Sequence, residues 1–254
     1  MRGDSGLLPR FWFRAGRARW RDQRAEIRAL VAAIGPGDAA ADVGANKGAY
    51  LPWLSRAAGP EGRVVAFEPQ PDLAAYLVRA CGAAGLSNVA VEAKGVSEKG
   101  GALRLHVPGA AGPSPGATFE TSVAAQSAGR DVEVPVVALD DAFAGEGRRI
   151  SALKIDVEGH ELAVLRGARG ILDRHAPTVV VESEGRHVGE AGLAAVLGFF
   201  AERGYAGSFV QRGRLLPVAA FDPAVHQRRG PGRFWDAADY ANNFVMRPRG
   251  GGRG

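Results

Sequence analysis

Sulfur is scarce in this sequence: its 254 residues include one cysteine, Cys81, and two methionines. A single cysteine excludes an internal disulfide, and no Cys/His spacing typical of a zinc site is present. Cys81 lies in an apolar stretch of helical character, where we expect a buried and unreactive thiol. The fold must therefore depend on an ordinary hydrophobic core, for which this length and a hydrophobic content of 46% are sufficient.

Long hydrophobic runs are also missing. No apolar stretch approaches the roughly 20 residues that a membrane-spanning helix needs. Near the N-terminus, Arg14 directly follows the aromatic run of residues 11–13, and this mixture does not resemble a secretory signal. We therefore expect a cytoplasmic protein with no transmembrane segment.

Lysine is rare, with 4 residues against 28 arginines, and the positive charge is unevenly distributed. Residues 1–28 hold eight arginines and three acidic residues, which accounts for the whole net charge of +5. The remainder of the chain is neutral. A basic N-terminal arm favours nucleic acid, anionic lipid or an acidic protein as a partner. A solvated arm without a specific partner is the alternative.

The strongest positive signal is the segment 42–48, which reads DVGANKG. The apolar run 39–43 leads into it, and the amphipathic stretch 50–58 follows at once. This order predicts a strand, a tight turn and a helix. In an open α/β sheet, ligands bind at such a turn, where the strand ends. Glycine suits the turn because it allows φ > 0 and a close approach of backbone to ligand.

Strands and helices alternate along the rest of the chain. Strands are predicted at 39–43, 64–67, 88–92, 152–155, 178–181, 205–210 and 243–246. Helices are predicted at 22–34, 50–58, 71–84, 139–149, 161–172 and 193–202. This alternation predicts an α/β fold with a mostly parallel, doubly wound sheet and right-handed crossovers.

Other segments interrupt this pattern. Residues 100–137 contain two alternating stretches around a loop rich in glycine, proline and serine, which predicts a small β insertion able to cover or select a substrate. Residues 1–20 and 217–241 are predicted to be irregular. We expect a basic arm and helix over 1–37, one domain over 38–247, and a flexible tail over 248–254.

Three acidic residues end three predicted strands at one edge of the sheet: Asp42, Glu68 and Asp156. Glu68 follows Asp42 by one strand-helix unit, where a carboxylate can accept both hydroxyls of a ribose. The turn reads Gly-x-x-x-Gly, and Asn46 occupies the position where a dinucleotide site needs glycine against the pyrophosphate. This argues for a nucleoside ligand without phosphates.

Two stretches carry a family resemblance: 42–50, DVGANKGAY, and 154–161, KIDVEGHE. They resemble the two signature stretches of the FkbM family of S-adenosylmethionine-dependent methyltransferases. The segment 67–69 followed by Leu73, and the closing segment 243–245, are similar to that family too. The resemblance covers roughly residues 38–247. It implies a Rossmann-like class I methyltransferase fold, in which the C-terminal strand is antiparallel to the rest of the sheet, and S-adenosylmethionine as the cofactor.

The resemblance also implies which residues hold the cofactor. Asp42 and the turn 44–48 would cradle the methionine part, and Glu68 would bind the ribose. Glu92 and Ala93 would lie along the adenine, by their position at the end of the third strand. The predicted cofactor-binding residues are Asp42, Gly44, Ala45, Asn46, Gly48, Tyr50, Glu68, Glu92, Ala93 and Asp156.

Methyl transfer to an alcohol needs an aligned acceptor and benefits from a general base. We predict Asp156, Glu158 and His160 as catalytic residues, with Glu182 as a further candidate. His187 also follows a strand end, but we expect an ordinary loop histidine there. The carboxylates of Asp156, Glu158 and Glu182 could together bind Mg²⁺, a hard cation. We assign no metal ligands.

The predicted function is methyl transfer from S-adenosylmethionine to a hydroxyl of a small molecule or glycan. Three alternatives remain: a nucleic-acid methyltransferase that uses the basic arm, a nicotinamide-dependent oxidoreductase, and a non-catalytic nucleoside-binding protein. No motif indicates the acceptor or the oligomeric state.

Overall fold

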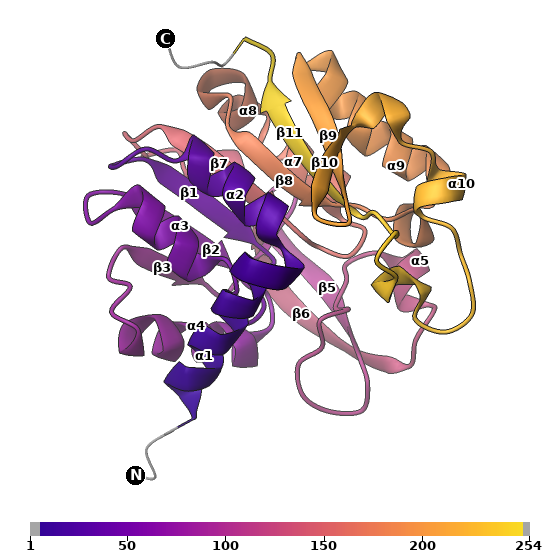
Figure 1. Ribbon diagram of the computed structural model, residues 1–254. Helices are drawn as coiled ribbons and strands as arrows, with labels where there is room; N and C mark the ends of the chain where they lie inside the picture. Colours follow the sequence, from indigo (N-terminus) through magenta and orange to yellow (C-terminus); the bar gives the residue numbers. More distant parts are fainter. Residues whose placement is uncertain (1–5, 251–254) are drawn as a thin grey trace.

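A computed structural model describes residues 6–250, and its centre is an eight-stranded sheet in the order β10-β9-β11-β8-β7-β1-β2-β3 (Figure 1). The strands are β1 Ala39–Val43, β2 Arg63–Phe67, β3 Val89–Glu92, β7 Ile150–Ile155, β8 Thr178–Glu182, β9 Tyr205–Gln211, β10 Arg214–Pro217 and β11 Asn243–Pro248. Strands β3, β2, β1, β7 and β8 are parallel, and β11 is antiparallel to both β8 and β9. The predicted mostly parallel sheet with an antiparallel C-terminal strand is confirmed.

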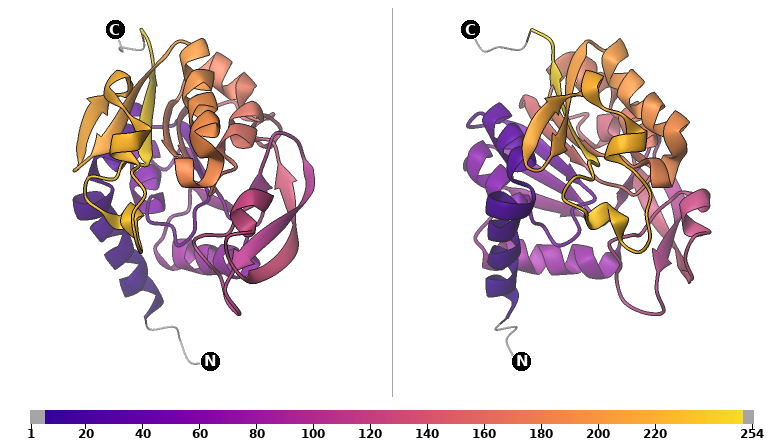
Figure 2. Two further views of the ribbon diagram at one scale, coloured as in Figure 1. Left: turned by 90° about the vertical axis from the view of Figure 1, so that its right-hand side faces the viewer. Right: turned by 45° about the vertical axis from the view of Figure 1, so that its right-hand side comes forward.

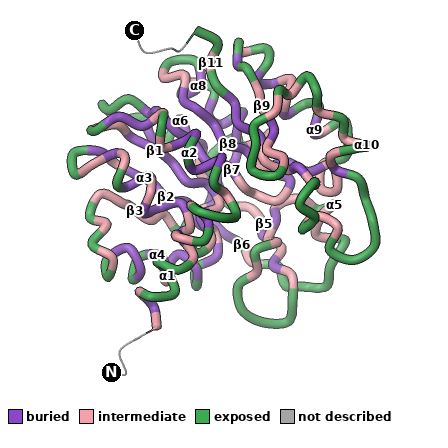
Figure 3. The backbone as a smooth tube through the Cα atoms, viewed as in Figure 1, coloured by how far each residue is buried: buried purple, intermediate pink, exposed green. Residues whose placement is uncertain are grey.

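Helices cover both faces of this sheet, because successive strand residues point to opposite sides. One face packs on α1 to α4 through residues such as Leu30, Leu54 and Leu77. The other face packs on α6 to α9 through residues such as Leu165 and Phe200. The bounds are α1 Leu7–Arg17, α2 Arg24–Ala33, α3 Leu51–Ala58, α4 Pro71–Ala83, α6 Leu139–Ala142, α7 Glu161–Arg166, α8 Arg169–His175 and α9 Gly185–Glu202. The central strands are therefore buried on both faces, as Figure 3 shows.

The chain changes direction along the sheet at β1. Strands β1, β2 and β3 extend toward one edge, and the chain then returns to place β7 on the other side of β1. The carboxyl ends of β1 and β7 therefore meet at a topological switch point, which is where open α/β sheets bind ligands.

The predicted insertion is present as a separate three-stranded sheet in the order β4-β6-β5. Its long strands are β5 Gly101–Pro108 and β6 Gly129–Val137, which pair antiparallel, and β4 is Gly95–Val96. The loop between β5 and β6 contains the short helix α5 Thr121–Ala124. The insertion stands beside the main sheet, as the left view of Figure 2 shows.

The prediction of irregular structure over residues 1–20 is wrong for its described part. Residues 7–17 form α1, which continues into a π-helical turn, η1 Ala18–Asp22. The buried side chains Leu7, Phe11 and Ala15 follow a spacing of four residues, so α1 packs one apolar stripe on the domain. Residues 1–5 of the predicted arm lie outside the described residues.

Other boundaries differ in smaller ways. The predicted helix 161–172 is two helices, α7 and α8, and the predicted helix 139–149 is regular only over α6. Within residues 217–241, Pro217 ends β10, and the regular structure after it consists of the short helices η2 Val218–Ala220, α10 Pro223–His226 and η3 Phe234–Asp236. Strand β11 extends to Pro248, and residues 251–254 of the predicted tail lie outside the described residues. Within the described range, no helix combines the length and the apolar character needed to cross a membrane.

We expect Phe11→Ala to lower the free energy of unfolding by about 3–5 kcal/mol, because a fully buried phenylalanine would be truncated. Phe13→Ala is the matched control, since Phe13 is 69% exposed on the same helix and its loss should change stability by less than about 0.5 kcal/mol. Urea unfolding followed by circular dichroism measures both. Equal stability of the two variants would show that α1 is not part of the cooperative fold.

Candidate functional site

Three neighbouring strands end at the same level. Asp42 pairs with Ala66 and Val43 pairs with Phe67, so the end of β1 lies beside the end of β2. Val43 also pairs with Ile155 on its other side. Gly44, Glu68 and Asp156 therefore follow directly from three adjacent strands at one edge.

The turn after β1 is held tightly against β7. Gly44 has φ +75°, and a Cβ atom there would lie 1.9 Å from the backbone oxygen of Asp156. Only glycine allows this approach. Asn46 has φ +48°, an uncommon conformation for a residue with a side chain, and its backbone N–H donates to Glu68 Oε2 at 2.8 Å. The turn thus joins the ends of β1, β2 and β7.

A buried lysine neutralises the carboxylates below this turn. Lys154 Nζ lies 3.3 Å from Asp42 Oδ1, 3.3 Å from Asp156 Oδ2 and 2.8 Å from the carbonyl oxygen of Gly44, to which it donates. Burial alone would lower the pKa of Lys154, but the charges of Asp156 and Asp42 raise it overall. Lys154 is therefore a permanent cation at the switch point.

Asp42 lies deeper than the other predicted cofactor residues. Its side chain is 1% exposed, and neither carboxylate oxygen has a hydrogen-bond partner of good geometry among the described residues. Asp42 is not among the residues that line the cavities described below. In this geometry its main contact is Lys154, and its effect on a ligand would pass through that residue.

A first cavity, here named the loop cavity, has a volume of about 370 Å³ and lies over the turn. Its floor consists of residues 44–47, Ala49, Tyr50, Lys154 and Asp156. Its other lining residues come from α1, η1 and the residue that follows η1: Phe13, Arg14, Arg17, Ala18, Asp22 and Gln23. The N-terminal segment therefore contributes directly to the candidate site.

A second cavity, the Glu68 cavity, is smaller, at about 50 Å³. Its lining residues are Gly44, Asn46, Glu68, Pro69, Gln70, Gly95, Leu105, Pro115, Ala117, Phe119, Asp156, Val157 and Glu158. It shares Gly44, Asn46 and Asp156 with the loop cavity, so the two cavities lie on either side of the same turn. Its described lining contains no lysine or arginine.

Glu68 is enclosed at the end of β2. It is 2% exposed, and its Oε1 accepts the backbone N–H of Gln70 at 2.9 Å. Burial raises the pKa of Glu68, while the bonds from Gln70 and Asn46 oppose that rise. Gln70 in turn exchanges two hydrogen bonds with the backbone of Ser114, at 2.9 Å and 2.8 Å. The insertion is thus fastened next to Glu68, a link that no sequence pattern indicates.

A third cavity, the outer cavity, has a volume of about 840 Å³ and lies beyond the ends of β7 and β8. Its main-domain lining is Glu158, Glu182, Glu184, Arg186, His187 and Asn242. The insertion adds Pro108, Pro115, Gly116, Val123, Gln126 and Ser127, and the segment 217–241 adds Arg229, Arg233, Phe234, Trp235 and Asp236. Pro115 and Glu158 line both this cavity and the Glu68 cavity.

Glu158 stands at this junction in a strained conformation. Its φ is +49°, and its carbonyl oxygen accepts the hydroxyl of Thr118 from the insertion at 2.7 Å. A residue other than glycine in this region costs about 1–3 kcal/mol, and such strain concentrates at functional sites. The surrounding contacts therefore hold Glu158 where the two cavities meet.

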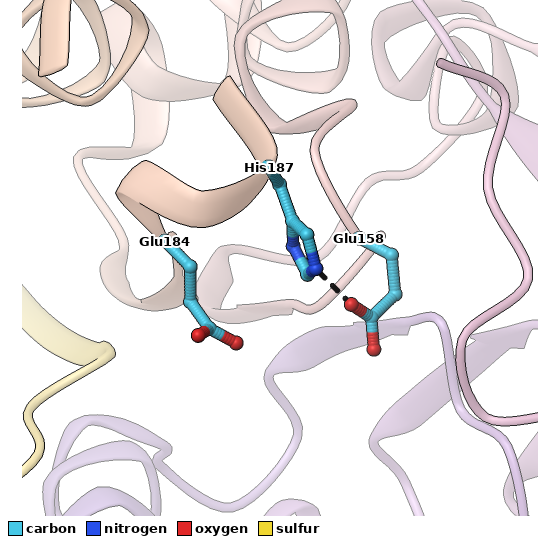
Figure 4. A group of neighbouring side chains, drawn as sticks. All are labelled: Glu158, Glu184 and His187. Carbon is cyan, nitrogen blue, oxygen red and sulfur yellow. Dashed lines mark ion pairs between the residues drawn. The ribbon is translucent and has the colours of Figure 1, made fainter. Parts of the chain in front are cut away.

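Glu158 forms a cluster with Glu184 and His187, shown in Figure 4. His187 Nδ1 lies 3.3 Å from Glu158 Oε2. Burial and the charge of Asp156 raise the pKa of Glu158 to about 8, and burial together with Arg186 lowers the pKa of His187 to about 4. At neutral pH the histidine is therefore uncharged, and the carboxyl group of Glu158 titrates within about one pH unit of neutrality.

The same cluster has one ligand atom per residue within 4.8 Å of the others, a spacing that could suit a metal ion. However, Arg186 donates to both oxygens of Glu184, at 2.6 Å and 2.7 Å, and Tyr240 donates to it at 2.7 Å. A guanidinium thus already supplies the positive charge that Glu184 needs. The Mg²⁺ set considered from the sequence, Asp156, Glu158 and Glu182, shares only Glu158 with this cluster.

His160 occupies a different environment from the other predicted catalytic residues. Its Nδ1 lies 2.6 Å from Glu120 Oε1 and its Nε2 lies 2.9 Å from Ser97 Oγ, while Phe119 packs on its ring. It is not among the residues that line the three described cavities. This geometry gives no support to a catalytic His160, whereas His187, predicted as a loop residue, lines the outer cavity.

The remaining predicted cofactor residues lie at three places: in the loop cavity, behind the turn and at the end of β3. Ala45 and Tyr50 line the loop cavity. Gly48 supports the turn from behind, since a Cβ atom there would lie 2.9 Å from Phe11 and 2.8 Å from Leu77. Glu92 ends β3 and pairs with Lys94 at 3.0 Å; neither Glu92 nor Ala93 is among the lining residues of the three cavities. The predicted adenine contact stays a prediction.

This sheet order, with the site at the switch point, defines a Rossmann-like class I methyltransferase fold, and solved structures agree. An FkbM methyltransferase from Methylobacillus flagellatus KT matches with a TM-score of 0.51 and 16% identity, over 94% of this chain and 58% of that one. This chain thus spans 58% of the length of that relative. At this identity, the similarity indicates the fold alone.

Two further structures match less closely. A SAM-dependent methyltransferase from Aquifex aeolicus has a TM-score of 0.47 and 16% identity, over 94% of this chain and 97% of that one. A SAM-dependent O-methyltransferase from Thermotoga maritima has a TM-score of 0.48 and 13% identity, over 89% of this chain and 65% of that one. No curated protein sequence matches the chain.

The family is established by sequence. The model of the Methyltransferase FkbM domain matches residues 42–206, which is more than half of the chain. The chain belongs to the FkbM methyltransferase family, as its two signature stretches predict. The matched region begins at Asp42 and therefore leaves out α1, η1 and α2.

Proposed function

We propose that this chain is an S-adenosylmethionine-dependent O-methyltransferase that acts on a hydroxyl of a small molecule or glycan. The observation that carries the proposal is the position of Glu158, which lines both the Glu68 cavity and the outer cavity. A donor in the Glu68 cavity and an acceptor in the outer cavity would meet at the carboxylate of Glu158. Family membership supports the donor, and the outer cavity supports an acceptor of moderate size.

The side chains that line the Glu68 cavity suit the nucleoside part of the donor in their chemistry. Glu68 offers a carboxylate for ribose hydroxyls, and Phe119 and Leu105 offer apolar surface for a base. Because the described lining contains no lysine or arginine, a phosphate-free nucleoside suits it better than a dinucleotide. This argues against the oxidoreductase alternative.

S-adenosylmethionine, when bound, supplies a methyl group on a sulfonium, so the protein mainly has to align the two reactants. Glu158 is the proposed general base, because it lies where the two cavities meet, its pKa of about 8 is close to neutral pH, and its Oε2 can take the hydroxyl proton. His187 would orient this carboxylate by donating its Nδ1–H to Oε2. Asp156 lines both the loop cavity and the Glu68 cavity, together called the donor cavities, and would face the positive end of the donor.

The nucleic-acid alternative rests on a free basic arm. In the structure α1 is packed against the domain and its Arg14 and Arg17 line the loop cavity. A small-molecule or glycan acceptor is therefore the better supported class.

We expect the protein to bind S-adenosylhomocysteine, the demethylated donor, in isothermal titration calorimetry. Glu68→Gln should weaken this binding by about 10- to 100-fold, the usual effect of removing a charged hydrogen-bonding partner. Glu61→Gln is the matched control, because Glu61 is an exposed residue before the opposite end of β2. Absence of binding by the wild type at millimolar concentration would remove the proposed function, and an unaffected Glu68→Gln variant would remove the role of Glu68.

A further inference from the structure

We propose that Arg14, on the N-terminal helix α1, binds the carboxylate of the amino-acid part of the donor. This inference rests on the proposed function and deepens it, because it assigns part of the donor site to a helix outside the region matched by the family model.

Helix α1 is fixed firmly enough to form part of a binding site. Phe11 is fully buried and lies against the turn, where a Cβ at Gly48 would come within 2.9 Å of its ring. Trp53, on α3, donates its indole N–H to the carbonyl oxygen of Ala15 at 3.0 Å. Figure 1 shows α1 lying next to α4. The side chains on its cavity side are thus held over the turn.

Four cations line the loop cavity: Arg14, Arg17, Lys47 and Lys154. Lys47 is exposed and no side-chain contact to a described residue orients it, whereas Arg14 is oriented by a neighbouring side chain and is not neutralised. Lys154 is paired with Asp42 and Asp156, and Arg17 is paired with Asp22. Arg14 donates to the hydroxyl of Tyr76 at 3.0 Å, and its guanidinium carbon lies 5.9 Å from the centre of that ring. No ion pair joins Arg14 to a described acidic residue.

The two donor cavities determine which end of the donor meets Arg14. The Glu68 cavity has a carboxylate and apolar walls, which suit ribose and base. Arginine and lysine side chains line the loop cavity but not the Glu68 cavity. Because both cavities share Gly44 and Asn46, a donor with its ribose at Glu68 extends its amino-acid end past the turn. An ammonium there can face Asp156, and a carboxylate can take paired hydrogen bonds from a guanidinium.

The test compares two ligands that differ in the amino-acid part. S-adenosylhomocysteine carries the carboxylate, and 5′-methylthioadenosine keeps the nucleoside but lacks that part. We expect Arg14→Gln to weaken S-adenosylhomocysteine binding by about 10- to 100-fold and 5′-methylthioadenosine binding by less than about twofold, as calorimetry measures. Arg14→Lys should retain part of the affinity for S-adenosylhomocysteine, because it keeps the charge and loses the paired geometry.

Arg10→Gln is the matched control, because Arg10 is an exposed arginine one turn earlier on α1 and does not line the loop cavity. It should leave both affinities unchanged. Binding of 5′-methylthioadenosine also reports that the Arg14 variant is folded. Equal weakening of both ligands, or unchanged binding of S-adenosylhomocysteine, would overturn the role of Arg14 while the donor site itself stands. A wild type that binds neither ligand would instead overturn the proposed function, and this inference with it.

Discussion

Gly44→Ala should lower the free energy of unfolding by about 3 kcal/mol or more and reduce S-adenosylhomocysteine binding at least about tenfold. The new Cβ atom would lie 1.9 Å from the backbone oxygen of Asp156, so the ends of β1 and β7 would have to separate. Both strands are buried, and neither can move without disturbing the sheet on its other side.

Gly37→Ala is the control for this variant. Gly37 also has a positive φ, +86°, but no heavy atom lies within 4 Å of its added Cβ. Gly37→Ala should therefore lower the free energy of unfolding only by the cost of a left-handed backbone conformation, about 1 kcal/mol, and leave the binding of S-adenosylhomocysteine intact. Urea unfolding and calorimetry measure both variants. If Gly44→Ala is no more destabilising than Gly37→Ala, the close approach of the turn to β7 does not exist in solution.

Lys154→Met should destabilise the protein by about 3–5 kcal/mol, because it leaves two carboxylates near the switch point without their cation. Most of this loss in stability should come from Asp42, since its side chain is 1% exposed and its unpaired charge cannot reach water. The double variant Asp42→Asn with Lys154→Met should recover a large part of the loss, because the buried charge is then removed.

Lys94→Met is the matched control for the lysine. Its ammonium lies 3.0 Å from Glu92 Oε2 at the end of β3, but both side chains are more than a third exposed. An exposed pair contributes only about 0–1 kcal/mol, so this variant should remain close to wild type in urea unfolding. A Lys154 variant as stable as the Lys94 variant, or a double variant less stable than the single one, would contradict a buried charge pair.

The sheet and the strand ends could be predicted because their signals are local. The run before Gly44, the turn 44–48 and the acidic residues at Glu68 and Asp156 each lie within a few residues of the structure that they specify. Parallel pairing then requires these ends to meet at one edge. The parallel pairing of the strands followed from the alternation of strands and helices, whereas their order in the sheet was not predicted.

Helix α1 was not predictable in the same way. Three of its eleven residues are arginines, and its apolar stripe of Leu7, Phe11 and Ala15 is narrow. Its conformation depends on tertiary contacts, such as the packing of Phe11 on the turn, that a sequence window does not contain. The consequence is that a segment interpreted as a separate basic arm is a wall of the candidate site.

The two histidines show a similar limit. His160 belongs to a signature stretch, yet Ser97 and Glu120 enclose it, and both lie more than 35 residues away in the chain. His187 belongs to no motif, and the fold of α9 brings it to the outer cavity. The environment of a histidine is determined by such distant contacts, so sequence spacing alone does not show which histidine faces a cavity.

The fastening of the insertion has a consequence for the order of events during turnover. The insertion is bonded through Ser114 to Gln70, beside Glu68, the proposed ribose ligand, and through Thr118 to the carbonyl of Glu158. A displacement at one attachment must therefore pull on the other. Loading of the nucleoside should set the shape of the entrance for the second reactant, so that sequential addition, donor before acceptor, is the natural kinetic scheme for this architecture.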